Sequence, residues 1–214
     1  MSVVTNITAQ KRTANRRNVF LDGRFAFGCH LNVVAKFRLR EGLSLSDDQV
    51  RAVRDGEVRQ ECFDKAMAYL QSRLHARSEL SKKLMRREYG PTIIDAVLDD
   101  LVRLGYVDDA RFAQTMAQSG AERKKHGPRR AMVELARRGV SGEVARRAVA
   151  LTYEARDVMA IARELAEKQA ARLRKLEPAV ARQRLAGMLQ RRGFDVGDIG
   201  SVIDEVLGAI DDSD

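Results

Sequence analysis

The sequence of 214 residues has no tryptophan, 5% aromatic residues, three prolines and two cysteines. Cys29 and Cys62 are too few for a disulfide framework, which favours a reducing compartment. No apolar run approaches the ~18 residues of a membrane helix, and the N-terminus lacks the apolar region of a secretory signal. We therefore expect a cytoplasmic protein with no membrane partner.

The chain is poor in aromatic residues but rich in alanine and in charged residues. The chain contains 28 alanines, and 32% of its residues are charged. This composition favours many small contacts between helices over one core rich in aromatic residues. Lysine and arginine exceed aspartate and glutamate, which gives a formal net charge of +9. Such an excess points to a polyanionic partner without saying which one.

The charge is distributed in blocks. Residues 1–40 carry a net charge of +7, whereas residues 195–214 contain seven acidic residues and no basic one. The segment between them is basic again, with nine Lys and Arg against three Glu over residues 121–147. The acidic end either meets a basic surface of a partner or keeps the chain soluble.

The N-terminal region contains the one clear β signal. Asp22-Gly23 stands between the apolar runs 19–21 and 25–27, as expected for a two-residue hairpin turn with positive φ at both positions. Residues 1–16 are polar, and we predict that they are disordered. Ser46 followed by Gln49 forms a capping box that predicts a helix start, and we expect Ser78 to cap a later helix.

A repeat dominates the remainder of the chain. "KLMRREYG" (83–90), "ELARRGVS" (134–141) and "MLQRRGFD" (188–195) align without gaps, with periods of 51 and 54 residues. Gly139 and Gly193 stand where a glycine would end a helix, and Pro128 and Pro178 stand where one would begin. Amphipathic patterns flank each copy, which indicates three helices per unit.

These observations predict an all-α fold of three tandem three-helix repeats, forming an elongated, curved array behind a small region with one β-hairpin. We expect a disordered basic segment over 1–16, the hairpin and helices over 17–58, and repeats over 59–107, 108–156 and 157–214, the last with an acidic end.

The sequence offers no catalytic constellation. Cys29, His30, Cys62 and His75 match no zinc spacing, and there is no phosphate-binding loop or nucleophile elbow. The acidic pairs 47–48, 99–100 and 108–109 contain residues that suit helix starts. We therefore expect that the protein is not an enzyme and that it has no metal site and no cofactor. An enzyme that uses these acidic pairs is the least favoured alternative.

Basic residues recur at the end of one helix in every copy. Favourable interaction with the helix dipole explains one cation per copy better than two. A regular series of such residues suits contact with phosphates of a nucleic acid or a nucleoprotein filament. The candidate binding residues are Lys82, Lys83, Arg86, Arg87, Lys124, Lys125, Arg129, Arg130, Arg137, Arg138, Arg191 and Arg192.

Four segments resemble one known family: the hairpin at Asp22-Gly23, "RSELSKKL" (77–84), "LGYVDDARFA" (104–113) and "GPRRAMVELARRGVS" (127–141). With a weaker third unit, residues 15–210 resemble the RecX family of bacterial recombinase regulators. The resemblance implies a non-enzymatic protein that binds the RecA filament in its groove or at its end, touching recombinase and DNA. It further implies inhibition of ATP hydrolysis, strand exchange and co-protease activity, and so modulation of DNA repair and the SOS response.

We expect a monomer that binds single- and double-stranded DNA non-specifically. The alternative is a general DNA-binding or transcription-regulating helical protein. Such a protein would prefer operator DNA over random duplexes by several orders of magnitude, whereas the repeats lack the polar recognition face of a helix-turn-helix reader.

Overall fold

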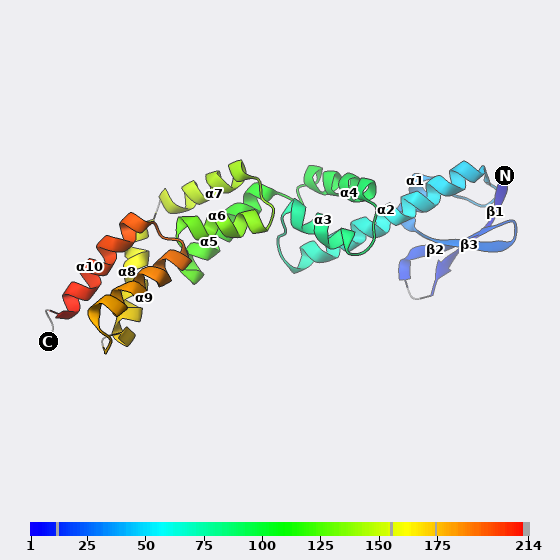
Figure 1. The fold of residues 1–214 in the computed structure, drawn as a ribbon. Coiled ribbons are helices and arrows are strands. Elements are labelled where there is room, and N and C mark those ends of the chain that lie inside the picture. The colour runs from blue at the N-terminus through cyan, green and yellow to red at the C-terminus, as the bar shows by residue number, and fades with distance from the viewer. Residues whose placement is uncertain (12, 155, 174, 212–214) are drawn as a thin grey trace. The chain divides into compact units, whose positions relative to one another are not determined.

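The structure is a computed structural model that describes residues 1–11, 13–154, 156–173 and 175–211 (Figure 1). Contacts divide the chain into two compact units. The first contains Met1–Leu74 and Leu80–Tyr106, and the second contains His75–Glu79 and the chain from Val107 onward. None of the helices described is long and apolar enough to cross a membrane.

The chain begins with a four-stranded antiparallel sheet. Its strands are β1 (Ser2–Gln10), β2 (Thr13–Leu21), β3 (Arg24–His30) and β4 (Ser44–Leu45), in the order β3-β2-β1-β4. The predicted hairpin is confirmed, because β2 and β3 pair with Val19 opposite Phe27. Asp22 and Gly23 have φ angles of 50° and 78° at the turn, as a type I′ turn requires.

The prediction of disorder over residues 1–16 was wrong in the part of that segment that the structure describes; Arg12 lies outside it. β1 pairs with β2 along most of its length, with two register irregularities. Val4 is its one fully buried side chain, so the strand carries almost no hydrophobic alternation. Its stability comes from ladder hydrogen bonds and a neighbouring hairpin, which a reading of apolar periodicity does not detect.

Two helices pack against the sheet: α1 (Leu31–Lys36) and α2 (Asp47–Ser72). The predicted capping box at Ser46 and Gln49 is present. A largely buried carboxylate, Glu57, ties α2 to the sheet by accepting the His30 backbone N–H at 2.7 Å and pairing with Arg16 at 2.6 Å. The boundary expected at residue 58 falls inside α2, which serves both the N-terminal region and the first repeat (Figure 1).

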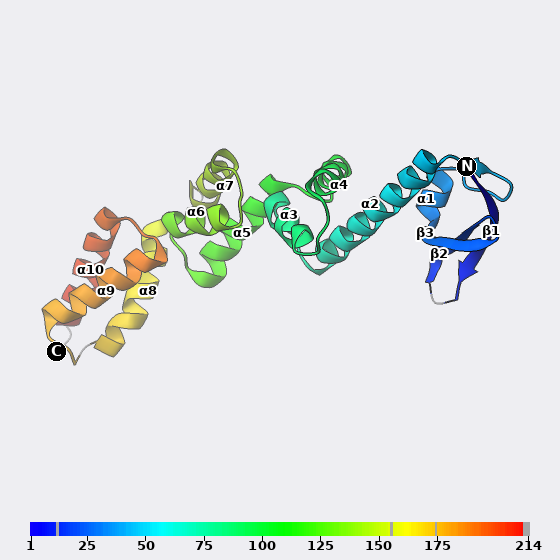
Figure 2. The same cartoon turned by 45° about the vertical axis from the view of Figure 1, so that its right-hand side comes forward.

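The three predicted repeats are confirmed. The first uses the end of α2 with α3 (Arg77–Met85) and α4 (Pro91–Arg103). The second consists of α5 (Asp109–Lys124), α6 (Pro128–Arg137) and α7 (Gly142–Glu154), and the third of α8 (Val158–Leu173), α9 (Pro178–Arg192) and α10 (Val196–Asp211). The chain is thus mostly helical, with a small N-terminal sheet and three three-helix domains (Figure 2).

Small side chains make the slim repeat core possible. In the third repeat Ala162, Ala166 and Ala170 form a buried stripe at a spacing of four residues along α8. Leucines of α9 and the face of α10 that carries Val202 pack against this stripe. Alanine lets helix axes approach closely, so the alanine-rich composition is explained by close packing within each repeat.

The cap expected at Ser78 was wrong. α3 begins one residue earlier, at Arg77, and Ser78 lies in its first turn. The Arg77 backbone N–H donates instead to the Asp109 carboxylate at 2.7 Å. The Asp109 side chain, 32 residues away in sequence, therefore accepts a backbone N–H at the start of α3 in place of a local cap. Local capping patterns in the sequence do not predict such a contact.

Candidate nucleic-acid interface

Each repeat has two consecutive arginines at the end of its middle helix or directly after it: Arg86 and Arg87, Arg137 and Arg138, and Arg191 and Arg192. α6 ends at Arg137, and Gly139 turns the chain with a φ of 76°. α9 ends at Arg192, and Gly193 turns it with a φ of 88°. Neighbouring side chains at a helix end point in different directions, so the members of a pair have different surroundings.

In the second repeat the later arginine is used inside the protein. The Arg138 guanidinium pairs with the carboxylate of Glu79 at 2.8 Å. Gly139 lies so close to the same turn that an added Cβ would come within 2.6 Å of the Ser78 Cβ. Arg138 therefore joins the second repeat to the segment His75–Glu79, which belongs to the same compact unit.

In the third repeat the later arginine has an equivalent use. Arg192 donates through its guanidinium to the main-chain oxygen of Lys124. The backbones meet as well, since the Gly127 N–H donates to the Arg192 oxygen at 2.8 Å and the Arg129 N–H to the Gly193 oxygen at 3.1 Å. This joint between the second and third repeats leaves no room for a side chain at Gly127 or Gly193.

The earlier arginine of each pair is directed to solvent. The Arg137 side chain is 65% exposed and reaches the Glu134 carboxylate only at 3.7 Å. Arg86 and Arg191 are exposed, and neither pairs with a carboxylate in the described part of the chain. We call Arg86, Arg137 and Arg191 the outer arginines, and Arg138 and Arg192 the joint arginines.

The remaining candidates divide in the same way. Lys82 and Lys124 are exposed, and the described residues give their side chains no carboxylate partner. Lys125 pairs with Glu164 at 2.8 Å, Arg129 with Asp195 at 2.5 Å and Arg130 with Glu134 at 2.7 Å. These three charges are largely neutralised within the protein, which leaves less charge for an external anion.

Electrostatics show how closely the cations gather at the joint between the second and third repeats. The pKa of His126 is lowered from its ordinary value of 6.5, first by burial and then by the nearby charges of Lys124, Arg130 and Arg192. Its position is fixed by the main chain, since the His126 oxygen accepts the Tyr153 hydroxyl at 2.6 Å. His126 therefore lies in a positive potential, which favours an anion nearby.

The first repeat contains an aromatic and basic cluster that sequence reasoning missed. The Lys83 ammonium lies 4.7 Å and the Lys65 ammonium 5.7 Å from the centre of the Tyr69 ring. Arg87 donates to the Tyr69 hydroxyl at 3.4 Å, and this hydrogen bond is the largest cause of a lowered Tyr69 pKa. Lys65 and Tyr69 are spaced by four residues on α2, so they lie on the same face of that helix. This spacing is the sequence signal for the cluster.

Several carboxylates of the acidic end, residues 195–214, form ion pairs inside the second unit. Asp195 pairs with Arg129, Asp204 with Arg182 at 2.5 Å, and Glu205 with Arg163 at 2.8 Å. These three acids thus have basic partners within the part of the chain that the structure describes. The acidic end accordingly contributes to the packing of the second and third repeats.

The two cysteines and the acidic pair 108–109 have structural roles. Burial raises the pKa of the Cys29 thiol to about 12 and that of Cys62 to about 11, so both thiols are unreactive near neutral pH. Asp108 caps α5, and Asp109 accepts the Arg77 N–H. Among the described residues no cluster of three His, Cys, Asp or Glu side chains is placed to hold a metal ion.

Comparisons with known proteins agree with this architecture. The description "Regulatory protein RecX N-terminal domain" matches residues 2–46. The first, second and third RecX three-helix domains match residues 62–101, 108–149 and 156–203. Each matched range falls on one of the regions described above.

Individual relatives cover nearly the whole chain. The protein named Regulatory protein RecX from Levilactobacillus brevis is 30% identical over 195 residues, which are 91% of this chain and 73% of that protein. The one from Bacillus subtilis is 27% identical over 206 residues, covering 96% and 78%. A crystal structure of regulatory protein RecX, 23% identical, has a TM-score of 0.81 and covers 95% of this chain and all of that one.

The fold defines a mostly helical protein built from three tandem three-helix domains behind a small N-terminal sheet. Four domain matches in the expected order and the relatives above identify its kind more closely. The chain belongs to the RecX family, as the sequence resemblance predicts.

Proposed function

We propose that this chain is a negative regulator of the RecA recombinase, which it binds on the RecA–DNA filament. The observation that carries the proposal is the recurrence of an exposed outer arginine at the end of the middle helix in every repeat. Membership of the RecX family supports the choice of RecA as the partner. In this proposal the chain binds along the filament groove and inhibits ATP hydrolysis, strand exchange and co-protease activity.

The DNA contact is electrostatic and independent of sequence. Outer arginines and the unpaired Lys82 and Lys124 contact phosphates, while the Tyr69 cluster adds three cations in the first repeat. Exposed cations keep their long side chains mobile, so they can follow a backbone without fixing a base sequence. Phosphate contacts of this kind release counterions, and binding must therefore weaken steeply with salt.

The test compares two variants with equal changes in charge. One replaces Lys82, Arg86, Lys124 and Arg191 with Gln; the control replaces the exposed cations Arg24, Arg40, Arg172 and Lys175 with Gln. With single-stranded DNA, we expect the first variant to flatten the salt dependence of log K by up to about 3, from about 0.7 per phosphate contact. It should also inhibit the DNA-dependent ATPase of RecA less than the control does.

Equal inhibition by both variants would overturn the role of these cations. Binding along the groove also predicts that the amount of bound chain rises with filament length, whereas binding at the end predicts one or two chains per filament. A preference of several orders of magnitude for one duplex sequence over random DNA would favour the alternative of a transcription regulator.

A further inference from the structure

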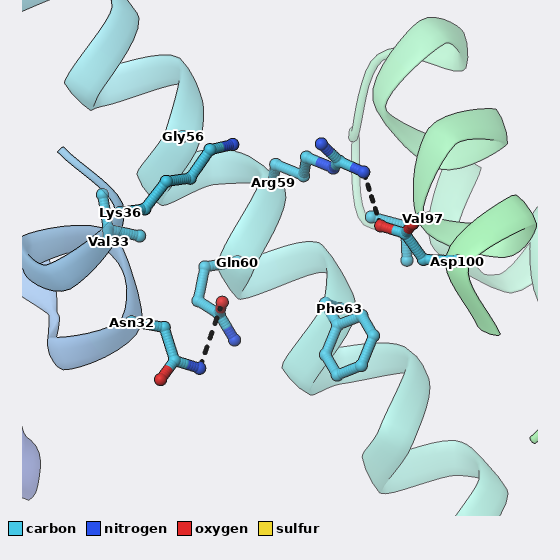
Figure 3. A pocket seen from close by; sticks show the side chains of 9 residues that line it. All are labelled: Asn32, Val33, Lys36, Gly56, Arg59, Gln60, Phe63, Val97 and Asp100. Atoms are coloured by element: carbon cyan, nitrogen blue, oxygen red, sulfur yellow. Dashed lines mark hydrogen bonds and ion pairs between the residues drawn. The ribbon is translucent and has the colours of Figure 1, made fainter. Parts of the chain in front are cut away.

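A small pocket lies in the first unit, where α1, α2 and α4 meet (Figure 3). Its volume is about 280 Å³, near the lower limit of roughly 300 Å³ for small-molecule sites. That space suits one planar ring group and excludes a dinucleotide-sized cofactor. The lining residues are Asn32, Val33, Lys36, Gly56, Arg59, Gln60, Phe63, Val97 and Asp100.

The inner surface of the pocket is apolar. Val33 and Val97 are buried, and the half-exposed Phe63 presents its ring from α2 (Figure 3). Gly56 permits the close approach of α1, because a Cβ at that position would come within 2.7 Å of the Phe37 ring. A flat aromatic surface in a recess favours a planar ligand that can stack on it.

Polar groups stand around this apolar surface. The Asn32 and Gln60 side-chain amides face each other, with the Asn32 Nδ2 donating to the Gln60 Oε1 at 3.5 Å (Figure 3). A bond of that length is weak, so the Asn32 amide and the Gln60 Oε1 remain available for a ligand. The Gln60 Nε2 donates to the Asp64 carboxylate at 2.8 Å, which holds the Gln60 amide in place and leaves its second N–H for a ligand. Two amides supply donors and acceptors together, which suits the mixed donor and acceptor edge of a nucleobase.

The charge of the pocket is positive. The Arg59 guanidinium pairs with the Asp100 carboxylate at 2.5 Å, but Asp100 also accepts from Arg103 at 3.0 Å. One carboxylate thus serves two guanidinium groups, while Lys36 is exposed at the rim with its ammonium 5.6 Å from the Phe37 ring. A single negative charge, such as one phosphodiester, complements this excess.

We propose that the pocket accepts one unstacked nucleotide of single-stranded DNA. Its base stacks on Phe63, the base edge bonds to the amides of Asn32 and Gln60, and the adjoining phosphate meets Lys36 and Arg59. The inference rests on the proposed nucleic-acid role and adds a base-binding subsite to the phosphate contacts. The subsite tolerates any base that stacks, because amides can present either donors or acceptors.

The experiment measures binding of the full chain, without recombinase, to oligo(dT) and to an abasic strand of equal length. Both strands carry the same phosphates, so their affinity ratio isolates the base. We expect the wild-type chain to favour oligo(dT) about tenfold. Phe63→Leu keeps an apolar side chain but removes the ring, and it should reduce this ratio to near one, as should the double change Asn32→Ala and Gln60→Ala.

A matched control is Lys175→Gln, an exposed cation outside the pocket, which should leave the ratio unchanged. An unchanged ratio in both pocket variants would overturn the nucleotide site. If the pocket variants lose binding to recombinase while the ratio stays unchanged, the nucleotide site is also overturned. The pocket would then be assigned to an acidic protein segment. The ratio is independent of RecA inhibition, so failure here and failure of the proposed function are distinguishable.

Discussion

The joints at Gly139 and Gly193 use the same Arg-Arg-Gly sequence in different ways. At Gly139 the contact runs through side chains, with Arg138 pairing with Glu79 at 2.8 Å. At Gly193 two backbone hydrogen bonds join the repeats directly. Side chains adapt to a substitution more readily than a backbone does. One motif therefore both joins repeats and presents charge, with a separate arginine for each role.

The largest expected effect comes from the glycines. In Gly193→Ala a methyl group would meet the Arg130 backbone, with its Cα at 2.8 Å, at a φ of 88°. We expect a loss of about 3 kcal/mol in the free energy of unfolding. Gly139→Ala has similar strain but meets the Ser78 side chain, so about 2 kcal/mol is expected. Urea unfolding measures both.

Gly105→Ala is the matched control, because Gly105 has a φ of 75° with open space where the Cβ would stand. It should lose only about 1 kcal/mol, the strain alone. Ser78→Gly should restore part of the stability of Gly139→Ala by making room. Equal losses at all three glycines would contradict the account of close backbone approach at Gly193.

A smaller effect separates the two arginines of one pair. Arg138→Gln removes the ion pair with Glu79, in which the Arg138 side chain is 39% exposed. Because solvent weakens such a pair, we expect a loss of about 0.5–1 kcal/mol in stability. Arg137→Gln should change stability by less than about 0.3 kcal/mol, since an exposed charge contributes little. A greater loss from Arg137→Gln would reverse the assignment.

The smallest effect concerns pH at the joint between the second and third repeats. The pKa of His126 is lower in the folded protein than its ordinary 6.5, so the unfolded chain takes up a proton first as the pH falls. His126 therefore lowers the free energy of unfolding as the pH falls below 6.5, whereas above pH 6.5 the folded protein keeps its full stability. We expect His126→Gln to unfold with a flatter pH dependence below pH 6.5. Superimposable profiles of variant and wild type would contradict the lowered pKa of His126 that burial and the nearby cations cause.

Most of the fold was predictable from local patterns. The hairpin at Asp22-Gly23, the capping box at Ser46 and the prolines that open the helices are signals within a few residues. β1 escaped prediction, since its pairing depends on a partner strand and only Val4 is fully buried. The start of α3 escaped for the same reason, because Asp109 reaches it from a distant helix.

The sequence predicts which basic residues gather at the helix ends, but it does not predict which of them face solvent. The sequence places two arginines at each helix end, yet it cannot say which of the two forms a close contact within the protein. Arg138 and Arg192 do so, whereas Arg137 reaches Glu134 only at 3.7 Å and Arg191 pairs with no carboxylate among the described residues. That difference depends on the tertiary approach of Glu79 and of the Lys124 carbonyl. The Tyr69 cluster was predictable only in part, because the spacing of Lys65 and Tyr69 lies within α2 whereas Lys83 reaches the ring from α3.

The most direct test of the two tasks compares two double variants in binding to single-stranded DNA across a range of salt concentrations. One replaces the outer arginines Arg137 and Arg191 with Gln, and the other replaces the joint arginines Arg138 and Arg192. We predict that the outer variant makes the salt dependence of log K shallower by about 1.4, from two lost phosphate contacts, while the joint variant leaves it nearly unchanged. An equal or larger change in the joint variant would contradict the separation of binding from joining.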